Sequence, residues 1–340
     1  MTDTIPVPTS TGAGAGQTMQ AIVQDTYGSA DVLRLARIAR PEAGDHEVLV
    51  GVRAAGLDRG TWHLMTGTPY AVRLAMGFRR PRNPVPGRDV AGTVVAVGSA
   101  VTRFAIGDEV FGIAPGSFSE YAVAPERKLA RKPASLTFEQ AAVVPISALT
   151  ALQGLCDVGR VEAGQKVLIT GASGGVGTYA VQLAKAFGAE VTAVSSTAKL
   201  DLVRSLGADH VIDYTRDDFA DGVHRYDLIL DIAGNPTLSR LRRALTPTGT
   251  VVIAGGEEGG SWTGSMDRQL RAVVLSTFVR QRLTMVTSKE RGSDLERLAD
   301  LIEAGTVMPS VDRTYPLDGV PDAMRHLEAG KARGKVAITI

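Results

Sequence analysis

The feature that most constrains the fold is a glycine-rich turn between a predicted strand and a predicted helix. Residues 171–177 read Gly-Ala-Ser-Gly-Gly-Val-Gly, after an apolar run over residues 166–170 and before a helical pattern over residues 178–187. Further predicted strands and helices alternate at residues 190–194, 198–206, 210–213, 228–230, 238–245 and 251–253. This alternation predicts βαβαβ units and an α/β fold with one doubly wound parallel sheet.

The same turn predicts a binding site for the phosphates of a dinucleotide. Glycine permits positive φ angles and close approach to the backbone, and the following helix directs amide groups and its positive dipole end at an anion. The alternative is a tight turn that binds nothing. The surrounding βαβαβ unit makes that alternative the weaker interpretation.

The end of the second predicted strand indicates which dinucleotide binds. Ser195 and Ser196 occupy the position where an NAD enzyme carries Asp or Glu, and Lys199 follows one helical turn later. A carboxylate would repel a 2′-phosphate, whereas hydroxyls and an ammonium group attract it. Lys199 alone would be interpreted as a solvated lysine. Together with the serines it favours NADPH over NADH.

The first part of the chain has a different pattern, of short strands separated by Gly and Pro. The predicted strands fall at residues 21–23, 47–52, 90–95, 107–112 and 118–123. They indicate an all-β region, interpreted as a barrel. One helix is predicted over residues 138–155, another over residues 290–303, and a final strand over residues 334–339, which we expect to return to the first lobe.

Composition excludes several classes of protein. A formal net charge of +1 over 340 residues offers no overall electrostatic footprint for nucleic acid or an anionic membrane, so a partner must be sought locally. A single cysteine, Cys156, excludes an internal disulfide and a cysteine-built metal cage. No secretory signal or membrane-spanning apolar run is present, so a cytoplasmic location is expected.

Four segments resemble the medium-chain dehydrogenase/reductase superfamily: residues 86–98, 171–177, 206–214 and 334–339. The likeness is strongest to its zinc-free quinone oxidoreductase and alcohol dehydrogenase-like branch. It implies a GroES-like barrel domain at residues 19–146 completed by 284–340, with a Rossmann domain at 147–283 inserted, after a flexible extension over 1–18. A strand over residues 283–286 would end the Rossmann sheet, and its exposed edge would pair with a copy in a homodimer.

The resemblance also implies which residues contact NADPH. They comprise the glycine turn, the residues around the adenosine phosphate and those after the strand ends near the nicotinamide: Thr150, Gly171, Ala172, Ser173, Gly174, Gly175, Val176, Gly177, Ser195, Ser196, Lys199, Tyr214, Ala233, Gly234, Ala254, Gly255 and Lys335. Lys335 is equally well interpreted as an exposed strand lysine.

No zinc site is expected. Asp58 stands where zinc-dependent relatives carry cysteine, their Gly-His-Glu is replaced around Arg88 and Asp89, and their third ligand aligns near Ile146. Arginine does not ligate zinc. An unorthodox site from Asp58, His63 and Asp89 is the alternative. We instead expect an ion pair between Asp58 and Arg88 to fill the vacated pocket, with extension of Arg88 to the surface as the other possibility.

The leading functional interpretation is an NADPH-dependent, zinc-independent reductase of activated C=C bonds or quinones, acting on a small molecule between the lobes. His63 and Tyr70 are the candidate proton donors, each also interpretable as a packed structural residue. With Asp58 and Arg88 they make up the candidate catalytic set. The alternatives are a carbonyl or alcohol oxidoreductase that uses His63 or Tyr70, and a non-catalytic NADPH-binding sensor.

An amphipathic helix is predicted over residues 267–283, where arginines alternate with apolar residues. It would roof the cleft or pack at a dimer contact. A membrane surface is the less favoured site because the apolar residues are few, and a plain surface helix is the remaining interpretation.

Overall fold

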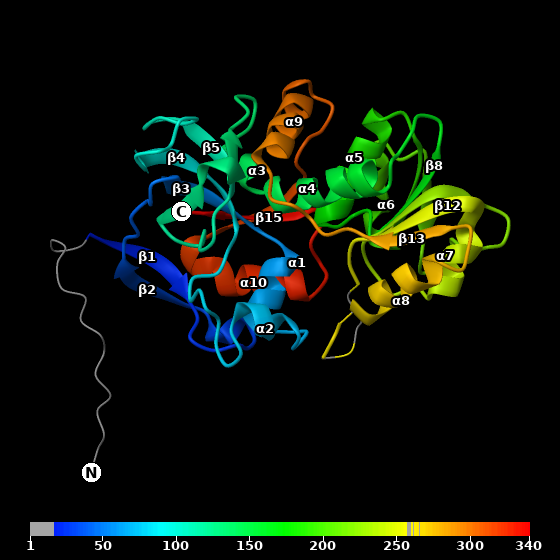
Figure 1. Cartoon of the computed structure of the whole chain (residues 1–340), viewed down its shortest axis with the longest axis horizontal. Coiled ribbons are helices and arrows are strands. Elements are labelled where there is room, and N and C mark those ends of the chain that lie inside the picture. Colours follow the sequence, from blue (N-terminus) through cyan, green and yellow to red (C-terminus); the bar gives the residue numbers. More distant parts are fainter. Residues whose placement is uncertain (1–16, 257–259, 261, 265) are drawn as a thin grey trace, which may run out of the picture.

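The chain folds into two lobes that lie side by side, each built around one large sheet (Figure 1). The computed structural model describes residues 17–256, 260, 262–264 and 266–340. Of the extension expected over residues 1–18, residues 1–16 lie outside the described residues, and Thr18 opens the first strand. No helix within the described ranges has the length and apolar character needed to cross a bilayer.

The lobe on the right of Figure 1 holds a six-stranded sheet in which all neighbouring strands run parallel. Its strands are β8 (Lys166–Thr170), β9 (Glu190–Ser195), β10 (His210–Asp213), β11 (Tyr226–Asp231), β12 (Leu245–Ile253) and β13 (Arg282–Met285). The connecting helices are α5 (Gly175–Ala186), α6 (Leu200–Ser205), α7 (Leu238–Ala244) and α8 (Met266–Ser276). The order β10-β9-β8-β11-β12-β13 grows outward from β8 in both directions, so the predicted doubly wound sheet is confirmed.

The other lobe is organised by a seven-stranded sheet. Its path is β14-β15-β3-β4-β5-β7, and β6 pairs with β3. The strands are β3 (Glu47–Leu57), β4 (Asp89–Val97), β5 (Glu109–Ile113), β6 (Tyr121–Pro125), β7 (Leu129–Arg131), β14 (Val311–Pro316) and β15 (Lys335–Thr339), with a separate hairpin of β1 (Thr18–Val23) and β2 (Arg34–Ala39). The last strand, β15, returns to this lobe, as the sequence predicted, and pairs antiparallel with β3.

Three helices of this lobe were not predicted. They are α1 (Arg59–Thr66), α2 (Val72–Met76) and α10 (Val320–Glu328). In Figure 1, α1 and α2 lie on the side of the lobe that faces the parallel sheet.

The single helix predicted over residues 138–155 is wrong in its continuity. The structure has α3 (Phe138–Ala142), a break, α4 (Pro145–Gln153) and a π-helical turn (Gly154–Val158). Pro145 causes the break because it lacks an amide N–H and fits only the first turn of a new helix.

The helix predicted over residues 267–283 is also too long. Helix α8 ends at Ser276, and Arg282 already belongs to β13. One basic side chain, Arg268, is buried beside Ala272 on the inward face of α8, whereas Leu270 and Val274 of the helix and Phe278 in the turn after it are exposed. The reason is an ion pair of Arg268 inside the lobe, described below.

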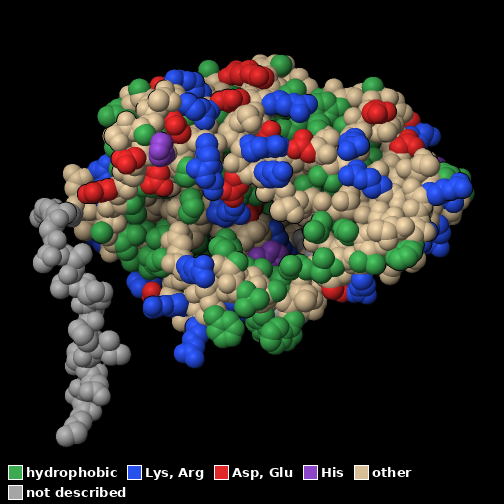
Figure 2. Space-filling model, in the orientation of Figure 1, with side chains coloured by type: hydrophobic (Ala, Val, Ile, Leu, Met, Phe, Trp, Pro, Cys, Tyr) green, Lys and Arg blue, Asp and Glu red, His purple; other side chains and the backbone are tan. Residues whose placement is uncertain are grey.

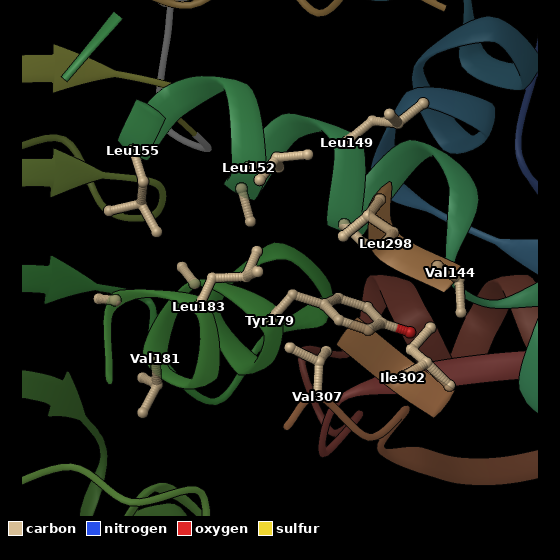
Figure 3. Close-up of a cluster of buried hydrophobic side chains, with 14 of the residues drawn as sticks. Val144, Leu149, Leu152, Leu155, Tyr179, Val181, Leu183, Leu298, Ile302 and Val307 are labelled. Atoms are coloured by element: carbon tan, nitrogen blue, oxygen red, sulfur yellow. The ribbon is translucent and has the colours of Figure 1, made fainter. Parts of the chain in front are cut away.

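The two lobes share one continuous hydrophobic core. Figure 3 shows side chains of α4, α5 and α9 (Gly292–Glu303) meeting in one cluster around Tyr179. The same cluster includes Ala91 and Phe111 of the first sheet and Val167 and Ile169 of the parallel sheet. The Tyr179 hydroxyl donates to the Val143 carbonyl at 3.1 Å, so the polar atom at the centre is satisfied. This core fixes the carboxyl edge of the parallel sheet relative to α1.

Candidate functional site

The glycine turn after β8 can be built only with glycine at two positions. Gly171 has a φ of 65°, and a Cβ there would lie 2.5 Å from the Cβ of Ala233. A Cβ on Gly177 would lie 2.2 Å from the carbonyl oxygen of Gly171. The turn is therefore pressed against the start of α5 and against the segment that follows β11, as a dinucleotide-binding turn requires.

We expect Gly177→Ala to lower the free energy of unfolding by about 1–3 kcal/mol and to weaken dinucleotide binding, because the methyl group must push the turn open. Gly174→Ala is the matched control for stability, since a Cβ there meets nothing closer than 3.3 Å and φ is −88°. Urea denaturation of both variants compares their stability, and cofactor titration of Gly177→Ala against the wild type measures the loss of binding. Equal stability of the two variants would contradict this assignment.

The N-terminus of α5 is suited to hold a pyrophosphate. Its N-cap residue is Gly174, and no side chain caps the helix. Its first amides and the positive end of the helix dipole are thus directed at the space beside the turn. Lys335 lies alongside, because a Cβ on Gly175 would meet the Lys335 Cδ at 2.9 Å and the Ser147 Oγ at 3.3 Å.

The predicted adenosine-side residues come together at the ends of β9 and β10. The Tyr214 amide donates to the Ser195 carbonyl at 3.1 Å, and the Tyr214 side chain is exposed. The Ser195 hydroxyl is buried and donates to the Ser173 hydroxyl at 2.9 Å, so it braces the glycine turn. Ser196 is half-buried, and neither residue next to it in the sequence carries a carboxylate.

Lys199 is tied to the loop before β15. Its Nζ donates to the carbonyl oxygens of Gly330 and Ala332 at 2.8 and 2.7 Å. Arg333 of the same loop donates to the Ala198 carbonyl at 2.7 Å and pairs with Asp201 at 2.6 Å. The sequence reasoning missed Arg333, although the basic run from Lys331 to Lys335 was a signal for a second cation here.

The predicted nicotinamide-side residues follow β11 and β12 at the carboxyl edge of the sheet. Ala233 touches the glycine turn, and the Thr150 hydroxyl donates to the Ile146 carbonyl at 2.8 Å. Behind them Asp231 and Arg268 form a buried ion pair at 2.7 Å. Burial raises the pKa of Asp231 to about 6, against the opposing effect of Arg268.

Arg268 fastens α8 to these loops. Its guanidinium also donates to the carbonyl oxygens of Pro236 and Gly255, at 3.0 and 2.9 Å. This contact explains why Arg268 faces inward, on the side of α8 that packs against the core through Ala272, and it fixes the segments that contain Ala233–Gly234 and Ala254–Gly255.

Asp58 and Arg88 do not form the expected ion pair. The Asp58 carboxylate caps α1, accepting from the Thr61 amide at 2.8 Å and the Thr61 hydroxyl at 3.2 Å. Arg88 pairs instead with Glu290, which also pairs with Lys128 at 2.5 Å. The expectation failed because the helix that begins after Asp58 was not recognised. The free amides at the start of that helix donate hydrogen bonds to the Asp58 carboxylate.

The buried ion pair in this region is a different one, between Asp89 and Lys335. Their charged atoms are 3.4 Å apart, and 1% of the Lys335 side chain is exposed. The second Asp89 oxygen accepts from the Ile146 amide at 3.0 Å. The interpretation of Lys335 as an exposed strand lysine is therefore wrong.

Burial raises the pKa of Asp89 to about 7, although Lys335 opposes the shift. Between the ordinary value near 3.8 and that value, the folded chain holds a proton that the unfolded chain has released. The free energy of unfolding is therefore expected to decrease as the pH rises through this window. The double variant Asp89→Leu/Lys335→Met should show a smaller decrease in urea denaturation series, with the part contributed by Asp231 remaining up to about pH 6. An identical slope for both proteins would refute the assignment.

The two candidate proton donors lie at and just after α1. The His63 Nδ1 donates to the Thr68 carbonyl at 2.7 Å, and the His63 ring meets Trp62 edge-on. Tyr70 is 38% exposed and meets the Trp262 ring edge-on at 5.7 Å. The Ala71 amide donates to the Trp262 carbonyl at 3.0 Å, so the segment before α8 crosses to the other lobe here.

This crossing was not predicted, and no local sequence signal pointed to it. Figure 2 shows a hollow between the two lobes. A substrate in that hollow would lie between α1 and the carboxyl edge of the parallel sheet.

Comparison with known proteins supports the same assignment from sequence. Residues 44–134 match the alcohol dehydrogenase GroES-like domain, and residues 206–338 match the family model described as zinc-binding dehydrogenase. A 2-methylene-furan-3-one reductase of Solanum lycopersicum is 36% identical, covering 97% of this chain and 81% of the relative. The chain belongs to the medium-chain dehydrogenase/reductase superfamily.

Within that superfamily the chain lies in the quinone oxidoreductase-like branch. The NADPH-dependent alkenal/one oxidoreductase of Arabidopsis thaliana chloroplasts is 36% identical, covering 94% of this chain and 79% of the relative. The solved quinone oxidoreductase of Coxiella burnetii superposes with a TM-score of 0.85 at 28% identity, covering 95% of this chain and 100% of that one. The chain is thus an oxidoreductase with a nicotinamide cofactor, and its first lobe is GroES-like.

Zinc, which one family model names, does not fit the residues present. Asp58 uses both oxygens to cap α1, Arg88 is a cation, and Asp89 is paired with Lys335. In the part of the chain that the structure describes, no group of three or more His, Cys, Asp and Glu side chains is placed to hold a metal ion. A nicotinamide dinucleotide does fit, because the glycine turn and the uncapped α5 form a cradle that a Cβ would fill.

Proposed function

We propose that the chain is an NADPH-dependent reductase of activated C=C bonds, in enones and quinones, that needs no metal. The observation that carries this proposal is the buried Asp89–Lys335 pair with its hydrogen bond to Ile146, which engages both oxygens of a carboxylate beside the cofactor cradle and leaves neither free for a metal. The relatives named as alkenal/one, furanone and quinone reductases support the substrate class.

The proposed roles of the cofactor residues follow from their positions. The uncapped start of α5 would bind the pyrophosphate, and Lys335 would add positive charge beside it. Ser196, Lys199 and Arg333 would surround the 2′-phosphate. Gly234 and Gly255, held by Arg268, would bring their segments close to the nicotinamide ring.

The reaction is a two-electron reduction that consumes one proton. Bound NADPH would supply a hydride for the β-carbon of the enone, whose C=C π bond breaks as the new C–H bond forms. The electron pair moves to the carbonyl oxygen, where a donor on α1 or Tyr70 would stabilise the enolate. The α-carbon then takes a proton, from water or through His63, and the saturated ketone leaves. His63 remains a proposed donor whose ring is oriented by Thr68.

The test is turnover of NADPH by the metal-stripped protein against enones, quinones, aldehydes and saturated ketones, with NADH in parallel. We expect turnover of enones or quinones, a preference for NADPH and no stimulation by added Zn²⁺. A profile restricted to ketones or alcohols would replace the proposal with a carbonyl oxidoreductase. Cofactor binding without any turnover would replace it with a sensor.

A homodimer is proposed as the assembly. Strand β13 ends the parallel sheet and pairs with β12 alone, and α8 beside it exposes Leu270, Val274 and Phe278. An unpaired edge next to an apolar face favours pairing with a second copy. Sedimentation of the wild type and of Phe278→Ser tests this, and a monomeric wild type would end the proposal. The cytoplasmic location expected from composition stays a prediction.

A further inference from the structure

One segment of the first lobe departs strongly from the near-neutral charge of the chain. Residues 59–88 contain six arginines and no Asp or Glu, whereas the whole chain has a net charge of +1. The segment contains α1, α2 and the loop that leads to β4. A local partner for a cationic surface is therefore to be sought here.

The outer part of this segment also exposes large apolar side chains. Leu74 is 74% exposed, Phe78 is 73% exposed and Met76 is 38% exposed. Trp262, whose carbonyl binds Ala71, is 73% exposed. Figure 2 shows hydrophobic side chains projecting from the lower edge of the molecule with basic side chains beside them. We call Leu74, Met76, Phe78, Arg79, Arg80, Arg82 and Trp262 the basic tip.

The backbone under the basic tip is held firmly. The Arg73 guanidinium lies between the rings of Tyr27 and Tyr70, 4.5 and 4.7 Å from their centroids, and donates to the Gly67 carbonyl. The Tyr27 hydroxyl donates to the Gly77 carbonyl at 2.6 Å. The apolar side chains are thus presented to solvent by a braced turn.

The three arginines of the basic tip are exposed and make no ion pair with any residue the structure describes. Other exposed arginines, such as Arg240, Arg325 and Arg333, are paired with carboxylates. Among the described residues, the positive charge of the basic tip therefore has no ion-pair partner, directly beside the exposed apolar groups.

The unpaired arginines and the exposed apolar side chains beside them favour one kind of partner. A second copy of the chain would bring the same three arginines against themselves, which like-charge repulsion opposes. An anionic bilayer surface attracts arginines and accepts exposed Leu, Phe and Trp side chains at the level of its headgroups. We propose that the basic tip docks the protein on anionic phospholipid membranes.

The docking surface adjoins the contact between the lobes. Tyr70 and Trp262 meet at the inner side of the basic tip, where the Ala71 amide also donates to the carbonyl of Trp262, which lies in the segment before α8. A docked protein would therefore open its hollow near the bilayer, where lipophilic molecules concentrate. The membrane contact itself does not rest on the proposed function.

The test is co-sedimentation of the full chain with vesicles of phosphatidylcholine alone or mixed with phosphatidylserine. We expect binding to the mixed vesicles, weakened by salt. The variant Arg79→Gln/Arg80→Gln/Arg82→Gln should lower the partition coefficient by about 100-fold, on the basis of each arginine's attraction to the surface. Leu74→Ser/Phe78→Ser should lower it at least about tenfold.

Matched controls come from other faces of the molecule. Arg37→Gln/Arg216→Gln/Arg280→Gln removes three exposed arginines, and Leu35→Ser/Val223→Ser removes two exposed apolar side chains. Both controls should bind vesicles as the wild type does, and circular dichroism checks that all variants fold.

Three results would overturn the proposal. The first is no binding to mixed vesicles, or equal loss of binding in the controls. The second is binding to soluble polyglutamate without binding to vesicles, which would indicate an acidic protein partner. The third is a change of oligomeric state in Leu74→Ser/Phe78→Ser, which would indicate a second copy.

Discussion

Replacing Lys335 by methionine is expected to lower the free energy of unfolding by about 3–5 kcal/mol above the Asp89 pKa, because it leaves a buried carboxylate without its partner. The Asp89 side chain has no exposure at all, and its ion-pair partner Lys335 is 3.4 Å away. Urea denaturation monitored by circular dichroism measures the loss.

Two variants make this result specific. The double variant Asp89→Leu/Lys335→Met should recover most of the stability, since an apolar pair replaces a buried ion pair at little cost. Lys331→Met removes an exposed lysine from the same loop and should change little. If Lys335→Met unfolds at the same denaturant concentration as Lys331→Met, the pair does not stabilise the fold.

Ser196→Glu is expected to weaken NADPH binding by about 100-fold and NADH binding only slightly. A carboxylate at the end of β9 would face the 2′-phosphate at close range, and like charges in such a site disfavour each other by several kcal/mol. Calorimetric titration with each cofactor measures both affinities on the same protein.

The selectivity of that effect identifies the phosphate subsite. Ser135→Glu adds the same charge at an exposed position before α3 and should leave both affinities unchanged. A parallel loss for NADPH and NADH in Ser196→Glu would mean that the variant distorts the glycine turn, and the assignment of Ser196 would fail.

The sequence sufficed to predict the parallel sheet because its signals are local. The apolar run of β8, the glycines at 171 and 177 and the helix after them lie within about one βαβ unit, so spacing alone constrains their arrangement. The return of β15 to the first lobe was predicted from the resemblance. The same local logic brought Ser195, Ser196 and Tyr214 to one end of the sheet.

The predictions that failed needed contacts between distant positions. Arg88 and its partner Glu290 are 202 residues apart in the sequence, and Lys335 and Asp89 are 246 residues apart. The cap formed by Asp58 was within reach of local reasoning, because an Asp before a helical pattern is an N-cap signal. That signal was read as a substituted metal ligand instead.

Helix α8 shows a second limit of prediction from the hydrophobic pattern. Its residues were correctly seen as amphipathic, but amphipathicity does not say which side faces the core. Only the buried Asp231 at the end of β11 draws Arg268 inward and leaves Leu270 and Phe278 exposed. Which side chains of a helix face the interior thus depends on their tertiary partners.

The central claim is hydride transfer to the β-carbon of an activated double bond without a metal. The most direct measurement uses NADPH deuterated at the transferable position, an α,β-unsaturated ketone and the metal-stripped protein, with the product analysed by NMR. The account predicts a saturated ketone with one deuterium on the β-carbon. Deuterium on the carbonyl carbon of an allylic alcohol, or a product that forms only when zinc is added, would contradict it.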